Sequence, residues 1–131
     1  MKPEELVPEI VVKSVQRSLD FYCKVLNFSV VKRVPETGEP TWAEITNGPA
    51  KLMLQKWTTT LDEMPKLKKR KKGGITIFVF RLKDSNEINK LSNNISNEIE
   101  NILTLRNTDY GTVELGISDP DGYIILFQAN V

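Results

Sequence analysis

The chain has 131 residues, 40% of them hydrophobic and 27% charged, and it has no run near the roughly 18 apolar residues of a membrane-spanning helix, so we expect one soluble globular domain. Its 18 basic and 17 acidic residues give a net charge of +1, too weak a field to favour nucleic acid or a membrane surface as a partner. Cys23 is the single cysteine and histidine is absent, which excludes an internal disulfide and a cysteine-based zinc site and removes the commonest metal ligand.

The first half of the chain predicts a strand, a helix and three further strands. Its N-terminal residues, MKPEELVPE, contain acids and prolines rather than the apolar stretch of a secretory signal, so we expect a cytoplasmic protein. Residues 6–12 are rich in β-branched side chains, and Ser14 is placed to cap a helix whose apolar residues have helical spacing: Val15, Leu19, Tyr22 and Leu26. Strand-length segments follow at 28–34, 41–46 and 51–57, each bounded by Gly, Pro or Asn. The pattern predicts a βαβββ module over about residues 5–60.

A basic segment separates this module from the rest of the chain. Residues 66–72 hold six of the 18 basic residues, between Pro65 and a pair of glycines. A block of like charge in such a setting is usually a solvated connector, and no aromatic residue is interleaved to stack on bases. We therefore expect residues 61–73 to be a linker. An anion-binding or nucleic-acid-binding role for this basic run is the alternative.

The second half predicts the same order of elements over about residues 74–131. A strand at 75–82 is followed by Asp84 and Glu87, a D-x-x-E capping arrangement, and by apolar residues at helical spacing: Ile88, Leu91 and Ile95. Strands follow at 100–107, 110–118 and 123–130, the last two joined by a DPDG turn. Two βαβββ modules form an internal repeat of structure, in which neither half could bury its sheet face alone.

Three stretches of this sequence resemble the vicinal oxygen chelate superfamily of glyoxalases, bleomycin resistance proteins and extradiol dioxygenases. They are LVPEIVVKSVQRSLDFYCKVLNF at the start, KLMLQ at the end of the first module, and YGTVELGISDPDGYIILFQ at the end of the chain. The resemblance spans Leu6 to Gln128. It implies an α+β fold in which the two modules pair into curved mixed sheets around a cleft, with the helices on the outer faces, while leaving the activity open.

The same resemblance implies where a metal would be held. The family's metal enzymes direct four ligands into the cleft, and these positions carry over to Val7, Leu126 and the neighbourhoods of Met53 and Ile77. All four residues are apolar, whereas Zn or Ni needs imidazole, thiolate or carboxylate donors. We therefore expect no metal and no cofactor.

Other carboxylates could in principle rebuild a site for Mg or Mn. Glu9, Glu44 and Glu114 lie on predicted strands, but scattered strand glutamates are more often solvent-facing or paired with Lys or Arg, and we favour that interpretation. A serine or cysteine nucleophile would need lysine as its base, and no spacing singles one out. No catalytic residue is predicted.

The predicted cleft offers an apolar and aromatic surface instead. If Val7 and Leu126 face inward, strand alternation turns Glu9, Val11, Ile124 and Gln128 inward as well, and it gives shared faces to Met53, Gln55 and Trp57 and to Trp42 and Glu44. The predicted ligand-binding residues are therefore Glu9, Trp42, Glu44, Met53, Gln55, Trp57, Ile77, Leu126 and Gln128. The alternative is that both tryptophans fill the core or a dimer interface.

The hypothesis that follows is a metal-free binding protein like the bleomycin resistance branch, sequestering a hydrophobic or aromatic compound. Members of that branch are acidic, whereas this chain is near neutral, so bleomycin itself is a poor fit as ligand. The alternative is a lyase, isomerase or dioxygenase with a nonstandard metal site, and a third possibility is a partner-binding module acting through the basic segment. We expect a homodimer, because the family commonly closes its clefts across subunits and exposed sheet edges are usually covered.

Overall fold

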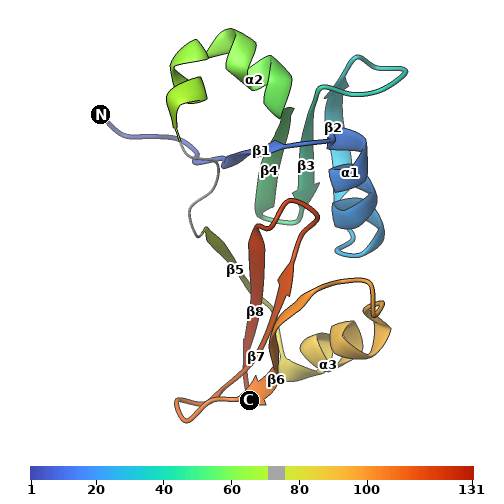
Figure 1. Cartoon of the computed structure of the whole chain (residues 1–131). Coiled ribbons are helices and arrows are strands. Elements are labelled where there is room, and N and C mark those ends of the chain that lie inside the picture. Colours follow the sequence, from blue (N-terminus) through green and yellow to red (C-terminus); the bar gives the residue numbers. More distant parts are fainter. Residues whose placement is uncertain (71–75) are drawn as a thin grey trace. The chain divides into compact units, whose positions relative to one another are not determined.

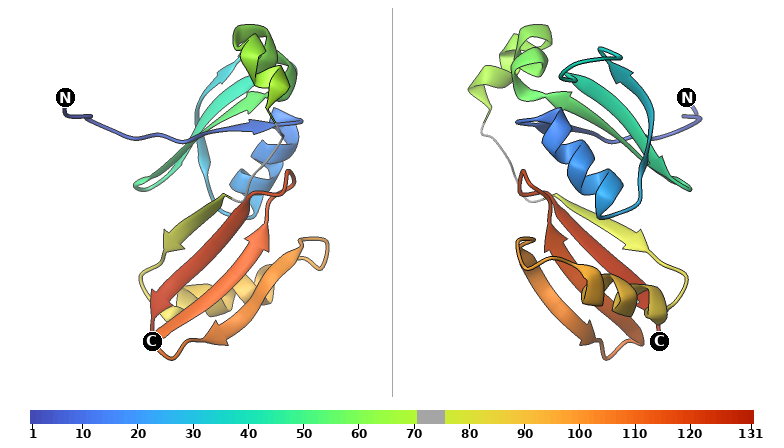
Figure 2. Two further views of the ribbon diagram at one scale, coloured as in Figure 1. Left: turned by 60° about the vertical axis from the view of Figure 1, so that its left-hand side comes forward. Right: turned by 90° about the vertical axis from the view of Figure 1, so that its right-hand side faces the viewer.

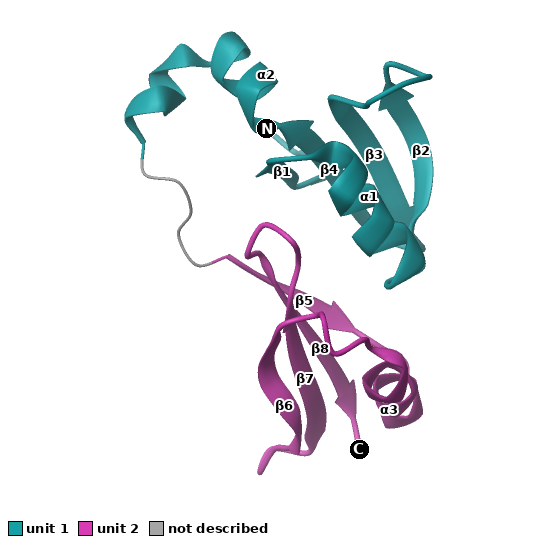
Figure 3. Ribbon diagram, turned by 45° about the vertical axis from the view of Figure 1, so that its right-hand side comes forward, with its two compact units in different colours: residues 1–71 teal, residues 72–131 magenta. Residues whose placement is uncertain are grey.

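The computed structural model describes residues 1–70 and 76–131 and divides the chain into two compact units, residues 1–71 and 72–131 (Figure 3). Each unit contains one four-stranded mixed sheet and a helix that follows its first strand. The predicted α+β fold of two βαβββ modules is confirmed. Within the described residues no helix is long and apolar enough to cross a membrane.

The first unit contains a sheet of order β1-β4-β3-β2, in which β1 runs parallel to β4 and the other pairs are antiparallel. Its first elements in chain order are β1 (Glu9–Val12), α1 (Val15–Lys24), β2 (Ser29–Val34), β3 (Trp42–Asn47) and β4 (Ala50–Lys56) (Figure 1). The Ser14 hydroxyl accepts a hydrogen bond from the Arg17 backbone N–H at 3.2 Å, which confirms the predicted N-cap of α1.

Helix α1 covers one face of this sheet (Figure 2). Val15, Leu19 and Tyr22 recur on one side of the helix and are buried. The strand residues of the same core alternate with polar or partly exposed neighbours, as one-sided burial requires: Ile10, Val12, Ala43, Ile45, Leu52 and Leu54. The ring of Tyr22 contacts those of Phe21 and Phe28 edge to face, at centroid distances of 5.1 and 5.7 Å, which fastens the end of α1 to the start of β2.

Two helical elements that the sequence pattern did not predict follow β4. They are α2 (Trp57–Glu63) and the 3-10 helix η1 (Pro65–Lys69). The prediction that Trp57 ends a strand is wrong: the ladder to β1 stops at Lys56, so Trp57 has no strand to pair with. The hydroxyls of Thr59 and Thr60 donate to the Lys56 carbonyl at 2.9 and 3.0 Å and hold the first turn of α2.

The predicted linker, residues 61–73, is therefore largely helical where the structure describes it. Lys66, Lys68 and Lys69 lie on η1 with exposed side chains, and Arg70 follows them. Lys71, Lys72 and Gly73 lie outside the described residues. That this segment serves as a solvated connector stays a prediction.

The second unit repeats the first with a sheet of order β5-β8-β7-β6, again with the outer pair β5 and β8 parallel. Its elements are β5 (Ile77–Arg81), α3 (Ser85–Asn94), β6 (Asn101–Asn107), β7 (Thr112–Ser118) and β8 (Ile124–Asn130). The Asp84 carboxylate caps α3 by accepting from the Glu87 N–H at 3.2 Å, as predicted. In the DPDG turn, Gly122 has φ +90°, a conformation that a side chain would strain.

A single residue anchors α3. Ile88 is fully buried, whereas the rest of the helix is partly or fully exposed. The helix contacts β7 and β8, whose buried side chains form the core of this unit: Val113, Leu115, Ile117, Ile125, Phe127 and Ala129. The attachment of α3 to its sheet therefore depends on one side chain far more than that of α1 does.

Replacing Ile88 by Ala should lower the free energy of unfolding by about 2–5 kcal/mol, because it deletes buried methyl groups and leaves a cavity. Asn89→Ala, at the exposed neighbouring position, should change it by less than about 0.5 kcal/mol. Denaturant unfolding followed by circular dichroism measures both. Equal effects of the two substitutions would contradict the anchoring role of Ile88.

Candidate functional site

Each sheet has a second face, opposite its helix, which we call the open face. In the first unit, strand pairing sets Glu9 beside Met53, Met53 beside Glu44, and Gln55 beside Trp42. Residues paired across neighbouring strands lie on the same side of a sheet, and these five alternate with the core residues that face α1. The structure therefore brings five of the predicted site residues together on one open face.

The Trp42 indole is fixed on this face by a carboxylate. Its Nε1–H donates to Glu9 Oε1 at 3.0 Å. Glu9 is on β1 and Trp42 on β3, and β4 lies between these strands, so the contact passes over β4 on the open face. Trp42 is half-buried. The hydrogen bond orients a large apolar ring and engages Glu9.

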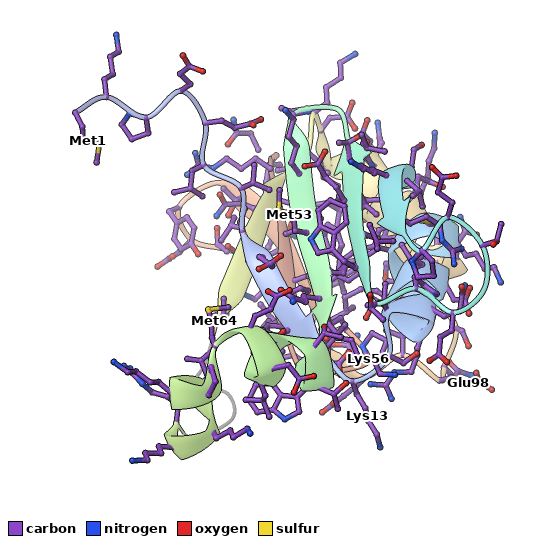
Figure 4. The ribbon with its side chains drawn as sticks, turned by 90° about the horizontal axis from the view of Figure 1, so that it is seen from above. Met1, Lys13, Met53, Lys56, Met64 and Glu98 are labelled. Carbon is purple, nitrogen blue, oxygen red and sulfur yellow. The ribbon has the colours of Figure 1, made fainter. Side chains whose placement is uncertain are left out.

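The middle strand β4 contributes Met53 and Gln55 to the same face. Figure 4 labels Met53 along β4 and Lys56 at the end of the strand, where α2 begins. Gln55 is 5% exposed, and its Nε2 donates to Glu63 Oε2 at 3.1 Å and to Thr59 Oγ1 at 3.5 Å. Since both acceptors belong to α2, this helix closes one end of the open face.

Trp57 does not lie on that face, contrary to the prediction. It occupies the first turn of α2 and is half-buried, so it does not share strand alternation with Met53 and Gln55. The i to i+4 spacing of Trp57 and Leu61 is a helical signal. That signal was available in the sequence, but it competes with the strand-like run just before it.

In the second unit the predicted residues Ile77, Leu126 and Gln128 lie on the open face. Strand pairing sets Ile77 beside Ile124 and Leu126 beside Val79, and these residues alternate with Phe78 and the buried Ile125 and Phe127. Ile77 is 51% and Val79 50% exposed. The edge strand β5 thus presents apolar side chains on this face.

A row of polar residues crosses the same open face. Arg81, Gln128, Glu114 and Arg106 lie side by side in the strand register, one on each strand. Arg81 Nε donates to Gln128 Oε1 at 3.4 Å, Gln128 Nε2 donates to Glu114 Oε2 at 3.0 Å, and Arg106 Nη2 donates to Glu114 Oε1 at 2.9 Å. We call these four residues the polar row. By the repeat that matches Met53 with Leu126, Gln128 occupies the place of Gln55 in the first unit.

Glu114 is the buried centre of the polar row, at 3% exposure. Besides Arg106 and Gln128 it accepts a hydrogen bond from the Tyr110 hydroxyl at 3.2 Å. The Arg106 guanidinium, followed by the Gln128 amide, lowers the pKa of the Glu114 carboxyl against the opposing effect of burial. Glu114 is therefore paired with an arginine that favours its ionised form, the arrangement that we favoured for it.

The residues present do not fit the four-ligand metal centre that the family resemblance implies. Met53, Ile77 and Leu126 provide no imidazole, thiolate or carboxylate, and Val7 precedes β1. Among the described residues no group of three or more His, Cys, Asp or Glu could hold a metal ion. Two carboxylates on the open faces, Glu9 and Glu114, are already engaged by Trp42 and by the polar row.

Glu114→Gln should make the stability of the protein less sensitive to acid. A carboxyl with a lowered pKa in the folded state stabilises the fold above its ordinary value of 4.5, and this contribution is lost as the pH falls through the folded-state pKa. We expect the variant to be less stable at pH 7 by on the order of 1–3 kcal/mol and the difference to shrink in acid. Denaturant unfolding across pH measures this. Glu98→Gln, at an exposed position, is the control; a difference for Glu114→Gln that stays constant with pH would contradict the argument.

The model of the Glyoxalase/Bleomycin resistance protein/Dioxygenase superfamily matches residues 6–127. A catechol-2,3-dioxygenase of Bacillus subtilis (strain 168) is 30% identical over 118 residues, which cover 87% of this chain and 37% of that protein, so the chain spans little more than a third of the length of this relative.

Solved structures share the fold at low identity. A glyoxalase/bleomycin resistance protein/dioxygenase family enzyme from Burkholderia phytofirmans PsJN has TM-score 0.78 and 15% identity, covering 95% of this chain and 97% of that one. TioX from Micromonospora sp. ML1 has TM-score 0.73 and 16% identity, covering 98% and 100%. Lactoylglutathione lyase from Agrobacterium tumefaciens has TM-score 0.71 and 16% identity, covering 98% and 96%. With both modules present and the family model matched over nearly the whole chain, this protein belongs to the glyoxalase/bleomycin resistance protein/dioxygenase superfamily.

Proposed function

We propose that this protein is a metal-free member of the superfamily, of the bleomycin-resistance-like kind, that sequesters a hydrophobic or aromatic compound. The observation that carries the proposal is the fixed Trp42 indole on the open face of the first unit, held by Glu9 and adjoined by Met53 and Gln55. A flat ring held in one orientation can stack on a ligand without first losing conformational freedom.

The surroundings of Trp42 suit a ligand that is apolar with few polar groups. In the strand register Trp42 adjoins Val34, which is 47% exposed, and Gln55 adjoins Val11. The polar residues near them include Glu9, Glu44 with its strand neighbour Lys32, and Gln55 with its partners Thr59 and Glu63. An apolar surface with a small number of placed polar groups is typical of small-molecule sites, and the methionine adds an adaptable contact.

The competing proposal is an enzyme with a nonstandard metal set, since similar proteins include a catechol-2,3-dioxygenase and a lactoylglutathione lyase. Residues at the family's ligand positions argue against it, because Val7, Met53, Ile77 and Leu126 supply none of the usual donors. Glu9 and Glu114 do not replace the missing metal donors while Glu9 accepts from the Trp42 indole and Glu114 accepts from Arg106 and Gln128.

Substitution of Trp42 should weaken binding of an apolar aromatic probe. For N-phenylnaphthylamine, a neutral probe followed by its fluorescence, we expect Trp42→Leu to raise the Kd about three- to tenfold, the loss of one aromatic contact. Trp57→Leu, the matched control on α2, should raise it less than twofold. Equal losses in both variants, or no saturable binding by the natural protein, would contradict the proposal. Stoichiometric metal in protein purified without chelator would favour the enzyme alternative.

We also propose that the protein is a homodimer. Each four-stranded sheet ends in edge strands, and β5 combines an edge position with half-exposed Ile77 and Val79. Edges of this kind are commonly covered by another chain, and two-fold pairing is the commonest solution.

Sedimentation equilibrium should give about twice the chain mass of 14.9 kDa at micromolar concentration, with dissociation on dilution. A mass of one chain at every concentration would refute the dimer. The aromatic-probe measurement would then be interpreted for a monomer.

A further inference from the structure

The polar row of the second unit does not balance its own charge. Two guanidinium groups, of Arg81 and Arg106, face one carboxylate, of Glu114. The strand register places no other charged residue on this open face, whose remaining residues on β5, β7 and β8 are Ile77, Val79, Thr112, Gly116, Ser118, Ile124, Leu126 and Asn130. The open face of the second unit therefore carries one uncompensated positive charge.

That charge belongs to Arg81. Arg106 is within 2.9 Å of Glu114 and neutralises it, whereas Arg81 contacts a neutral amide, the Gln128 side chain, through Nε. Within residues 1–70 and 76–131 no carboxylate forms an ion pair with Arg81, and its side chain is exposed. A guanidinium has five N–H donors, so the contact with Gln128 leaves most of them for another partner.

Gln128 also fixes where Arg81 lies. Its amide is held at both ends, donating to Glu114 and accepting from Arg81. Because Glu114 is buried and already accepts hydrogen bonds from three donors, it anchors Gln128. Arg81 is thus positioned by a chain of hydrogen bonds that runs through Gln128 to the ion pair of Glu114 and Arg106.

The next row of the same face is apolar. Strand pairing sets Val79, Leu126, Gly116 and Leu103 side by side, one on each strand. Gly116 is buried, and a Cβ there would lie 3.0 Å from the Leu103 Cβ, so Leu103 packs closely against this position. A positive group thus borders an apolar strip.

We propose that the open face of the second unit binds an anionic aromatic compound, with its acidic group paired to Arg81 and its apolar body on the row formed by Val79, Leu126 and Leu103. The inference rests on the proposed function and names the ligand class for the residues of the second unit. A cationic ligand would meet the free charge of Arg81 and find Glu114 already neutralised. An uncharged ligand would form no ion pair with Arg81, whose N–H donors would then remain bonded to water.

Two probes with the same aromatic skeleton test the proposal: anilinonaphthalene sulfonate, which is anionic, and N-phenylnaphthylamine, which is neutral. The natural protein should bind the sulfonate more tightly. Arg81→Gln should weaken sulfonate binding about three- to tenfold, the size expected for losing one partly exposed charged contact, and should change binding of the neutral probe by less than twofold. Arg81→Lys, which keeps the charge but loses Nε, should lie between.

The matched control is Lys83→Gln, which removes the same charge from an exposed position two residues beyond Arg81. It should leave the ratio of the two affinities unchanged, as should the double substitution Lys66→Gln and Lys68→Gln in the basic segment. Equal effects of Arg81→Gln and either control would overturn the proposal, because they would mean general attraction by surface charge. If the neutral probe binds and the sulfonate binds no better, this inference fails and the proposed function stands; if neither probe binds, both fail.

Discussion

The pairing register of the two sheets is the constraint on which the rest of the structure depends. Side chains of a strand alternate between two faces, so once Ile10, Val12, Ala43 and Ile45 are buried toward α1, their neighbours Glu9, Trp42 and Glu44 must lie on the other face. A shift by one residue would bury the carboxylates and expose the core. Burial of the apolar core residues thereby also brings the residues of the open face together, although these residues themselves contribute little to the hydrophobic driving force.

On this constrained scaffold the open faces of the two sheets are organised by packing and by paired charge. Positions that would hold a metal carry valine, methionine, isoleucine and leucine. Two carboxylates of the open faces accept hydrogen bonds, Glu9 from an indole and Glu114 from a guanidinium, an amide and a phenol. The hydrogen bond from Arg106 lowers the pKa of the Glu114 carboxyl, and three donors already contact this carboxylate.

Local pattern was sufficient to predict the fold and much of the site. Strand alternation gave a shared face to Met53 and Gln55 and another to Trp42 and Glu44, and the capping residues Ser14 and Asp84 located both helices, because alternation and capping depend on near neighbours in the sequence. The inward direction of Glu9 came from the family resemblance, and the strand pairing joins these residues on one face. The prediction that Trp57 ends a strand failed because the end of a strand depends on where its partner strand stops. For β4 that partner is β1, whose residues lie more than 40 positions away in the sequence. The polar row could not be predicted either: Arg81 and Gln128 meet only through β5–β8 pairing, which no local spacing encodes.

Gln55 and Gln128 occupy the same place in the two units but have different partners. The first is tied to Thr59 and Glu63 of α2, the second to Glu114 and Arg81. A repeated sheet provides two copies of each backbone position, and a change at one copy leaves the other intact. Selection can therefore make one surface more aromatic and the other more basic by single substitutions, without disturbing the scaffold. The open faces of the two units can therefore come to differ in chemistry while each unit keeps the same fold.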